Sequence, residues 1–223
     1  MDAEAQGPVY ALWNVYVGAD AGAAIADDAL SELSTAIDIA AKEGVMLRGL
    51  YDVSGLRADA DLMVWTHGDD PARLQKHARR FRRHLAGLGA RPVWNALGVH
   101  REAEFNRSHV PAFVRGVEPA AWAAVYPFNR SYEWYLLPEE ERRALLAEHG
   151  RAGAAYSTVL TNTVSAFALG DYEWVLPLEA DDPVDLVDLM RTLRATGARR
   201  HVREETPFFT GRRINVADLR SIL

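Results

Sequence analysis

The sequence contains no cysteine, which excludes disulfide bonds, thiolate metal sites and cysteine nucleophiles. No apolar run is long enough to cross a bilayer, and the start, MDAEAQGPVY, lacks the basic and apolar regions of a signal peptide. Positive charge is also scarce: 25 Lys and Arg stand against 31 Asp and Glu, a net charge of −6. A general nucleic-acid binder normally has a basic domain. We therefore expect a cytoplasmic globular protein that binds neither nucleic acid nor membrane.

Several catalytic motifs are also missing. There is no GxGxxG or GxxxxGK[ST] loop for phosphates, and no G-x-S-x-G elbow for a serine hydrolase. Neither HxxxH nor HExxH occurs, and no carboxylate cluster suggests a metal site built from protein ligands alone. The stretch HARRFRRHL, residues 77–85, is basic, and it reads as an amphipathic helix with a solvated cationic face. A phosphate or RNA site there is the alternative.

An internal repeat predicts the architecture. Asp-Asp-Pro occurs in both THGDDPARL and LEADDPVDL, and Asp69 and Asp181 are 181 − 69 = 112 residues apart. The same offset aligns VYALWNVYV with AWAAVYPFN, and RPVWNALGVH with REETPFFTGR. Repeats at a fixed offset indicate two copies of one structural unit.

The predicted elements follow the same order in both halves. In the first half we expect strands near 9–17, 45–53, 60–67 and 91–99, and helices near 25–43 and 71–86. In the second half we expect strands near 121–130, 157–168, 172–179 and 206–214, and helices near 138–152 and 183–196. This β-α-β-β-α-β order is the ferredoxin-like unit. The predicted fold is α+β, with two such repeats paired into a dimeric α+β barrel within one chain. The predicted divisions are 1–100, a linker at 101–120, and 121–223.

The halves differ at positions that could carry chemistry. Asn14 in the first half corresponds to Tyr126, and Ile37 corresponds to His149. Tyr126 lies in a run of six aromatic residues between Trp122 and Tyr135, out of 21 in the whole chain. Such a strand face is usually core.

His149 follows Leu145 by four residues on an apolar helix face. It is either a core or cap residue, or the single axial ligand of a haem iron, which needs one imidazole and an apolar pocket.

The strings VYPFNRSYEWYLLPEEERRALLAEHGRAG, DYEWVLPLEADDPVDLVDLMRTLRAT and HVREETPFFTGRR resemble the coproheme decarboxylases, in the actinobacterial branch of the chlorite dismutase-like superfamily. The resemblance spans nearly the whole chain. It implies the paired ferredoxin-like barrel, a homopentamer, and transient contact with an upstream ferrochelatase. The implied reaction is the hydrogen-peroxide-dependent decarboxylation of two propionates of iron coproporphyrin III (coproheme), which gives haem b.

The resemblance also implies roles for single residues. His149 matches the proximal iron ligand, and Tyr126 matches a tyrosine that becomes a radical and takes hydrogen from a propionate. His109, in the linker over the porphyrin pocket, matches a distal histidine that deprotonates peroxide. Arg130 matches a propionate contact and Trp134 a tryptophan near the reacting propionate.

Other residues are assigned less specifically. Phe128 belongs to the aromatic strand that would wall the porphyrin. Arg199, Arg200 and Arg203 are further propionate partners by charge alone. The alternative function is a haem-binding chlorite dismutase or peroxidase-like enzyme on the same fold, which would need a distal arginine. Arg107 and Arg115 are candidates for that distal arginine, but neither matches a motif of the family.

Overall fold

The computed structural model describes residues 7–19, 26–102, 104 and 110–223. The chain forms two compact units, one made of residues 1–100 with 210–223 and the other of residues 101–209. None of the helices in the described ranges is long and apolar enough to cross a membrane.

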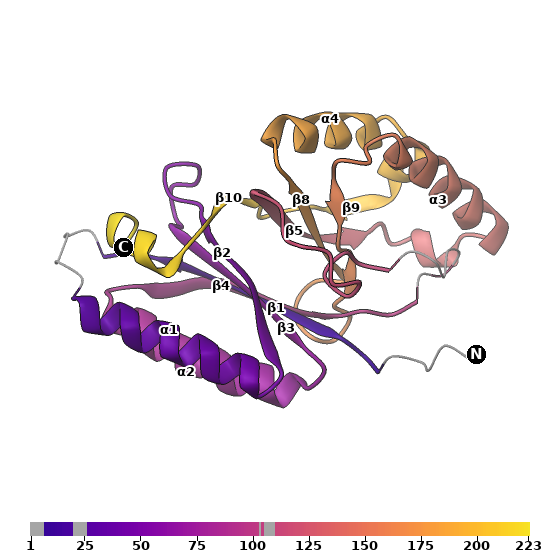
Figure 1. Ribbon diagram of the computed structural model, residues 1–223. Helices are drawn as coiled ribbons and strands as arrows, with labels where there is room; N and C mark the ends of the chain where they lie inside the picture. Colours follow the sequence, from indigo (N-terminus) through magenta and orange to yellow (C-terminus); the bar gives the residue numbers. More distant parts are fainter. Residues whose placement is uncertain (1–6, 20–25, 103, 105–109) are drawn as a thin grey trace. The chain divides into compact units, whose positions relative to one another are not determined.

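The first unit is an antiparallel sheet covered by two helices. Its elements are β1 (Tyr10–Val17), α1 (Asp27–Lys42), β2 (Val45–Asp52), β3 (Leu62–Gly68), α2 (Pro71–Gly87), β4 (Arg91–Val99), β10 (Phe209–Ile214) and the 3-10 helix η3 (Val216–Ser221). The strand order is β4-β1-β3-β2-β10. Helices α1 and α2 lie side by side against this sheet (Figure 1). This is the ferredoxin-like arrangement, with β10 added beside β2.

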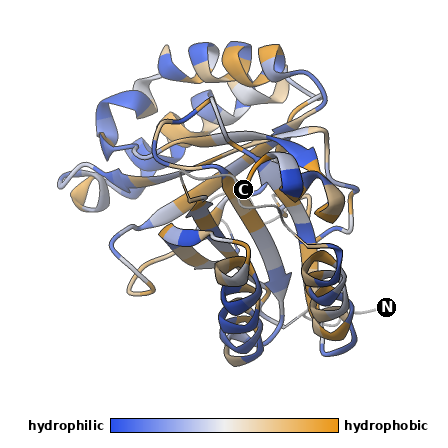
Figure 2. Ribbon diagram, turned by 90° about the vertical axis from the view of Figure 1, so that its left-hand side faces the viewer, coloured by the Kyte–Doolittle hydropathy of each residue, from blue (hydrophilic) through white to orange (hydrophobic). Residues whose placement is uncertain are grey.

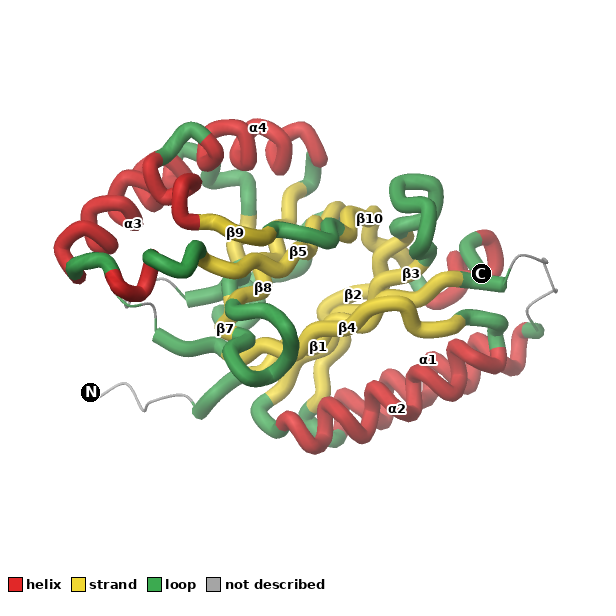
Figure 3. Tube along the Cα trace, turned by 180° about the vertical axis from the view of Figure 1, so that it is seen from behind, coloured by secondary structure: helices red, strands yellow, loops and turns green. Residues whose placement is uncertain are grey.

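The second unit repeats this plan, but it has two very short strands where the first unit has β2. Its elements are β5 (Trp122–Arg130), η1 (Trp134–Leu136), α3 (Glu139–Ala154), β6 (Leu160–Thr161), β7 (Val164–Ser165), β8 (Trp174–Ala180), α4 (Pro183–Arg194), η2 (Gly197–His201) and β9 (Val202–Glu204). β5 lies between β9 and β8, and β6 and β7 both pair with β8. Helices α3 and α4 lie on the same face of these strands (Figure 3).

The repeated Asp-Asp-Pro motif starts a helix in each unit. The Asp70 carboxylate accepts hydrogen bonds from the backbone N–H groups of Ala72 and Arg73, at 2.8 and 3.2 Å. The Asp182 carboxylate accepts one from Val184 at 2.9 Å. In both helices the proline that follows takes the first helical position, where a missing N–H costs no hydrogen bond.

Polar and apolar residues mix along the helices (Figure 2). α2 buries Leu74, His77, Phe81 and Leu85. His77, the first residue of the basic stretch 77–85, is one of these buried residues. Its side chain is fully buried, with Nε2 3.0 Å from a Glu43 carboxylate oxygen.

The predicted α+β fold is confirmed, and the predicted helices match α1 to α4 closely. The single strand predicted near 157–168 is wrong, because Asn162 interrupts it between β6 and β7. The Asn162 side chain is fully buried; it donates to Glu179 at 2.9 Å and accepts from the Phe113 N–H at 2.9 Å.

The compact units are not the sequence repeats, because β10 pairs with β2 of the first unit. The predicted divisions at 1–100, 101–120 and 121–223 stay a prediction.

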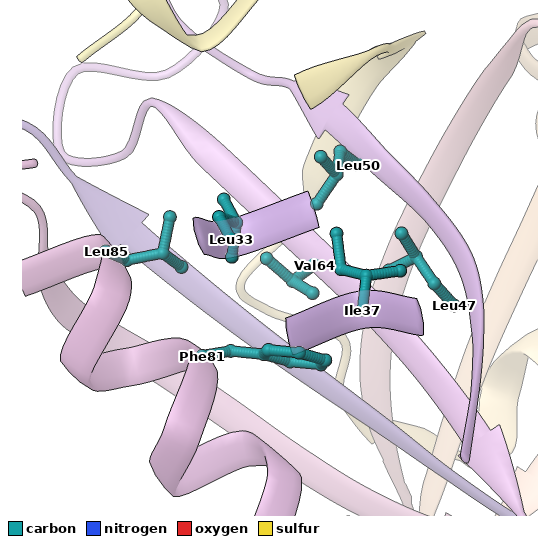
Figure 4. Close-up of a pocket in the computed structure, with 7 residues that line it drawn as sticks. All are labelled: Leu33, Ile37, Leu47, Leu50, Val64, Phe81 and Leu85. Carbon is teal, nitrogen blue, oxygen red and sulfur yellow. The ribbon is translucent and has the colours of Figure 1, made fainter. Parts of the chain in front are cut away.

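The first unit has an apolar core at the position equivalent to the candidate site. Ile37, the counterpart of His149, lines a void of about 10 Å³ beside Leu33 and Phe81 (Figure 4). Every residue that lines this void is apolar: Leu33, Ile37, Leu47, Leu50, Val64, Phe81 and Leu85. A water molecule needs polar partners, so this void is a packing defect and carries no chemistry.

Candidate functional site

The candidate residues lie on one face of β5. Because side chains alternate along a strand, Tyr126, Phe128 and Arg130 share a face. Tyr126 belongs to an apolar cluster with Leu186 and Leu189 of α4, so this face is the one covered by helices.

Tyr126 is held as a buried, neutral phenol. Its side chain is 3% exposed, and its ring stacks on Phe208 with centroids 4.3 Å apart. The hydroxyl donates to the Met190 sulfur at 3.4 Å, and a thioether is a weak acceptor. Burial, and then the negative charge of Glu205, raise the pKa of Tyr126 well above its ordinary value. The phenol therefore keeps its hydrogen near neutral pH.

Arg130 lies between two aromatic rings. Its guanidinium carbon is 4.2 Å from the Trp134 ring centroid and 4.9 Å from that of Phe128. Cation–π contacts of this kind hold a guanidinium in place and leave its N–H groups free to donate at the edge. Among the described residues this guanidinium makes no hydrogen bond or ion pair. Glu173 and Glu205 attract this guanidinium, but no carboxylate of the described residues is hydrogen-bonded to it, so its N–H groups can bind an anionic group of a ligand.

His149 has one ring nitrogen engaged. Its Nδ1 lies 3.2 Å from the Thr196 hydroxyl oxygen, and that hydroxyl donates to the Leu193 carbonyl at 2.8 Å. Within the described ranges, Nε2 has no hydrogen-bond partner. Burial, and then the positive charge of Arg130, lower the pKa of His149, which favours the neutral imidazole that metals bind. The predicted apolar face is only half-buried, since no residue of α3 is fully buried.

Trp134 is buried, at 2% exposed, between Arg130 and His201. The His201 ring centroid is 5.4 Å from that of Trp134, and its Nδ1 is 3.2 Å from the Ser131 hydroxyl. The segment from Ser131 to Trp134 is therefore fixed to η2.

Two of the arginines proposed by charge have partners. Arg199 and Arg194 both pair with the Glu205 carboxylate, the second at 2.7 Å. Arg203 donates to the Tyr132 hydroxyl at 2.8 Å. Arg200 is exposed.

Sequence reasoning missed Thr196, Glu205, Met190 and Phe208. Each reaches the site from a segment far from its partner in sequence, and no motif marks such contacts. His109 lies outside the described residues, so its distal role stays a prediction. The described part of the chain contains no group of three or more His, Asp or Glu side chains that could hold a metal ion.

The donor set fits an iron porphyrin. A porphyrin supplies four nitrogen ligands of its own, so the protein needs to contribute one neutral imidazole, and His149 offers a free Nε2. The propionates of the porphyrin need cations, and Arg130 has no other partner among the described residues. These two features fit a haem-type site.

Comparison with known proteins agrees with this class. The chlorite dismutase family matches residues 26–214, so the chain belongs to that family. It is 58% identical to the coproheme decarboxylase of Mycolicibacterium smegmatis, over 86% of this chain and 84% of that protein. It is 29% identical to the coproheme decarboxylase of Thermus thermophilus, over 78% of this chain and 74% of that protein. The resemblance stated from the sequence is confirmed.

Solved structures confirm the fold. The chlorite dismutase of Candidatus Nitrospira defluvii in complex with imidazole gives a TM-score of 0.82 at 20% identity, covering 96% of this chain and 94% of that one. A single-site mutant of the same enzyme gives 0.83 at 19% identity, covering 97% and 95%.

Proposed function

We propose that the protein is a hydrogen-peroxide-dependent coproheme decarboxylase. It converts iron coproporphyrin III to haem b by oxidising two propionates to vinyl groups with release of carbon dioxide. The 58% identity to a coproheme decarboxylase over most of the chain carries this choice of reaction. Among the described residues, His149 Nε2 and the Arg130 guanidinium have no hydrogen-bond partner, and this supports the binding mode.

Each propionate consumes one molecule of hydrogen peroxide. The propionate loses one hydrogen, its carboxylate leaves as carbon dioxide, and two electrons pass to peroxide, which takes up protons and becomes water. The bound iron porphyrin supplies the redox chemistry, and the protein positions it.

The residues of this chain have separate tasks in that reaction. His149 would bind the iron through Nε2, and Arg130 would hold a propionate by charge-assisted hydrogen bonds. Tyr126 would lose its phenolic hydrogen, as a proton and an electron, to the oxidising equivalent that peroxide delivers, and would recover a hydrogen from the propionate. His109 accepts the proton of peroxide, because the pKa of a histidine lies near the working pH. Phe128 and Trp134 hold Arg130 and line the site.

Direct turnover tests the proposal. The protein is incubated with iron coproporphyrin III and hydrogen peroxide, and the porphyrin is analysed by mass spectrometry for loss of two carboxyl groups. The matched control is the His149→Ala variant. A porphyrin that keeps all four propionates with the parent protein contradicts the proposal. Oxygen release from chlorite, measured with an electrode, tests the chlorite dismutase alternative.

The proposal includes assembly and cellular context. We propose a cytoplasmic homopentamer that receives its substrate from a ferrochelatase, as the family resemblance implies. Sedimentation equilibrium measures the number of subunits, and a mass equal to one chain would contradict the pentamer.

A further inference from the structure

The hydrogen bonds around His149 have a definite direction. The Thr196 hydroxyl has one hydrogen, and it points to the Leu193 carbonyl at 2.8 Å. With the hydroxyl hydrogen so directed, the oxygen is placed to accept a hydrogen bond from His149 Nδ1, 3.2 Å away, which puts the ring proton on Nδ1. In this tautomer Nε2 has no hydrogen and presents its lone pair.

Contacts on either side of this bond hold Thr196 in place. Its side chain is buried, at 8% exposed, directly after α4. Beside the contact between His149 and Thr196, the Glu148 carboxylate accepts a hydrogen bond from the backbone N–H of Gly197 at 3.1 Å. A Cβ on Gly197 would lie only 2.8 Å from Leu145 Cδ2, so the absence of a side chain lets α3 approach η2 this closely. Two adjacent hydrogen bonds, one to Thr196 and one to Gly197, therefore connect α3 to the segment that follows α4.

We propose that Thr196 is the positioning residue that fixes His149 in the tautomer able to bind iron. The inference rests on the proposed function for the identity of the ligand, and on the two hydrogen bonds for the tautomer. Partners of this kind orient metal-binding histidines, and their loss typically lowers metal affinity or activity about 10–100-fold. A neutral hydroxyl acceptor also leaves the imidazole less electron-donating than a carboxylate acceptor would.

Three variants separate the effect of the Thr196 hydroxyl from the effect of the side chain's shape. Thr196→Val keeps the shape and removes the acceptor, whereas Thr196→Ser keeps the acceptor. The Val substitution leaves the Leu193 carbonyl paired, because the backbone N–H of residue 196 also donates to it. Thr192→Val is the matched control, because Thr192 pairs with Tyr156 on the same side of α4 and not with His149.

The first measurement uses the protein without porphyrin. Long-range ¹H–¹⁵N correlation spectra at about pH 8, above the ordinary histidine pKa of about 6.5, distinguish the two neutral tautomers. His149→Ala identifies the signals. We expect the Nδ1–H tautomer in the parent, Thr196→Ser and Thr192→Val, and a mixture in Thr196→Val. An Nε2–H tautomer in the parent, or an unchanged Thr196→Val spectrum, overturns the inference.

The second measurement is the affinity for iron coproporphyrin, from absorbance titration. Thr196→Val should bind about 10-fold or more weakly, and Thr196→Ser close to the parent. Equal affinity in the parent and Thr196→Val overturns the positioning role. If His149→Ala binds the porphyrin with an unchanged spectrum, the proposed iron ligand is wrong. The tautomer measurement still decides the hydrogen-bond direction in that case, so the two failures are distinguishable.

Discussion

Tyr126 and its counterpart Asn14 show how one substitution between equivalent strands can introduce a chemically reactive side chain. Both occupy the helix-covered face of an equivalent strand, but Tyr126 brings an oxidisable phenol into an apolar layer. Within the described part of the chain, the phenol donates its hydrogen to a thioether, which is a weak acceptor. This is a suitable setting for a side chain that must lose its hydrogen to an oxidant and recover it from a substrate.

Tyr126→Phe separates chemistry from packing. The ring can still stack on Phe208, and the lost bond to Met190 is weak, so the free energy of unfolding should fall by at most about 1 kcal/mol. Decarboxylation should nearly stop, as followed by haem b formation in the same assay. A variant that folds and converts substrate at the parent rate would make Tyr126 a core residue only.

Arg130→Gln should weaken substrate binding about 10–100-fold, since hydrogen bonds to charged groups are worth about 1.5–3 kcal/mol. Arg130→Lys should recover part of the loss, because lysine keeps the charge but has no planar face to lie between Phe128 and Trp134. Absorbance titration measures both.

The control for Arg130 is Arg79→Gln, at an exposed position of α2. Its binding should match the parent. A second control uses the porphyrin with its carboxyl groups esterified, whose binding should not depend on Arg130. An equal loss in Arg130→Gln for the acid and the ester would place the guanidinium away from the propionates.

At the scale of the element, the two Asp-Asp-Pro helices should respond unequally to loss of their caps. Asp70→Ala removes two backbone hydrogen bonds from α2, and Asp182→Ala removes one from α4. Loss of an N-cap costs about 0.5–2 kcal/mol, so Asp70→Ala should be the more destabilising in urea unfolding. Asparagine at either position should restore most of the loss, since it caps nearly as well. Asp69→Ala, one residue before the cap, should be close to neutral.

Local signals in the sequence predicted the helices well. Capping aspartates, N1 prolines and apolar periodicity act within a few residues, so α1 to α4 could be placed from the sequence alone. The strand predicted near 157–168 failed because buried Asn162 bonds to Phe113 and Glu179, which are distant in sequence. β9 was not predicted, because a strand of three residues is too short to show an alternation of apolar and polar residues.

The same limit applies to the site. Family motifs indicated Tyr126, Arg130 and His149, but the partners that set their chemistry reach them only after folding. Thr196 has no motif, and only the close approach of α3 and η2 at Gly197 brings it to His149. Phe208 and Glu205 likewise meet Tyr126 through tertiary structure.

At the scale of the whole molecule, stability should depend on pH through buried histidines. Burial, and then the positive charge of Arg48, lower the pKa of His67 to about 4 in the folded protein. An unfolded histidine has a pKa of about 6.5. Between these two values the unfolded chain binds more protons than the folded one, so the free energy of unfolding rises with pH across this window. The full stability is present above about pH 6.5 and is lost as the pH falls through about 4.

His67→Gln should flatten this dependence, because glutamine does not titrate in the window. For the parent without porphyrin, the change in His67 alone should lower the free energy of unfolding at pH 5 by on the order of 2 kcal/mol relative to neutral pH. Urea unfolding of both proteins at pH 7 and pH 5 measures the difference. His149, whose pKa is lowered in the same direction, should leave a residual slope in His67→Gln. The double variant with His149→Ala should remove most of that remainder. Identical slopes in the parent and His67→Gln would mean that His67 protonates without loss of stability, and that other groups carry the acid sensitivity of the fold.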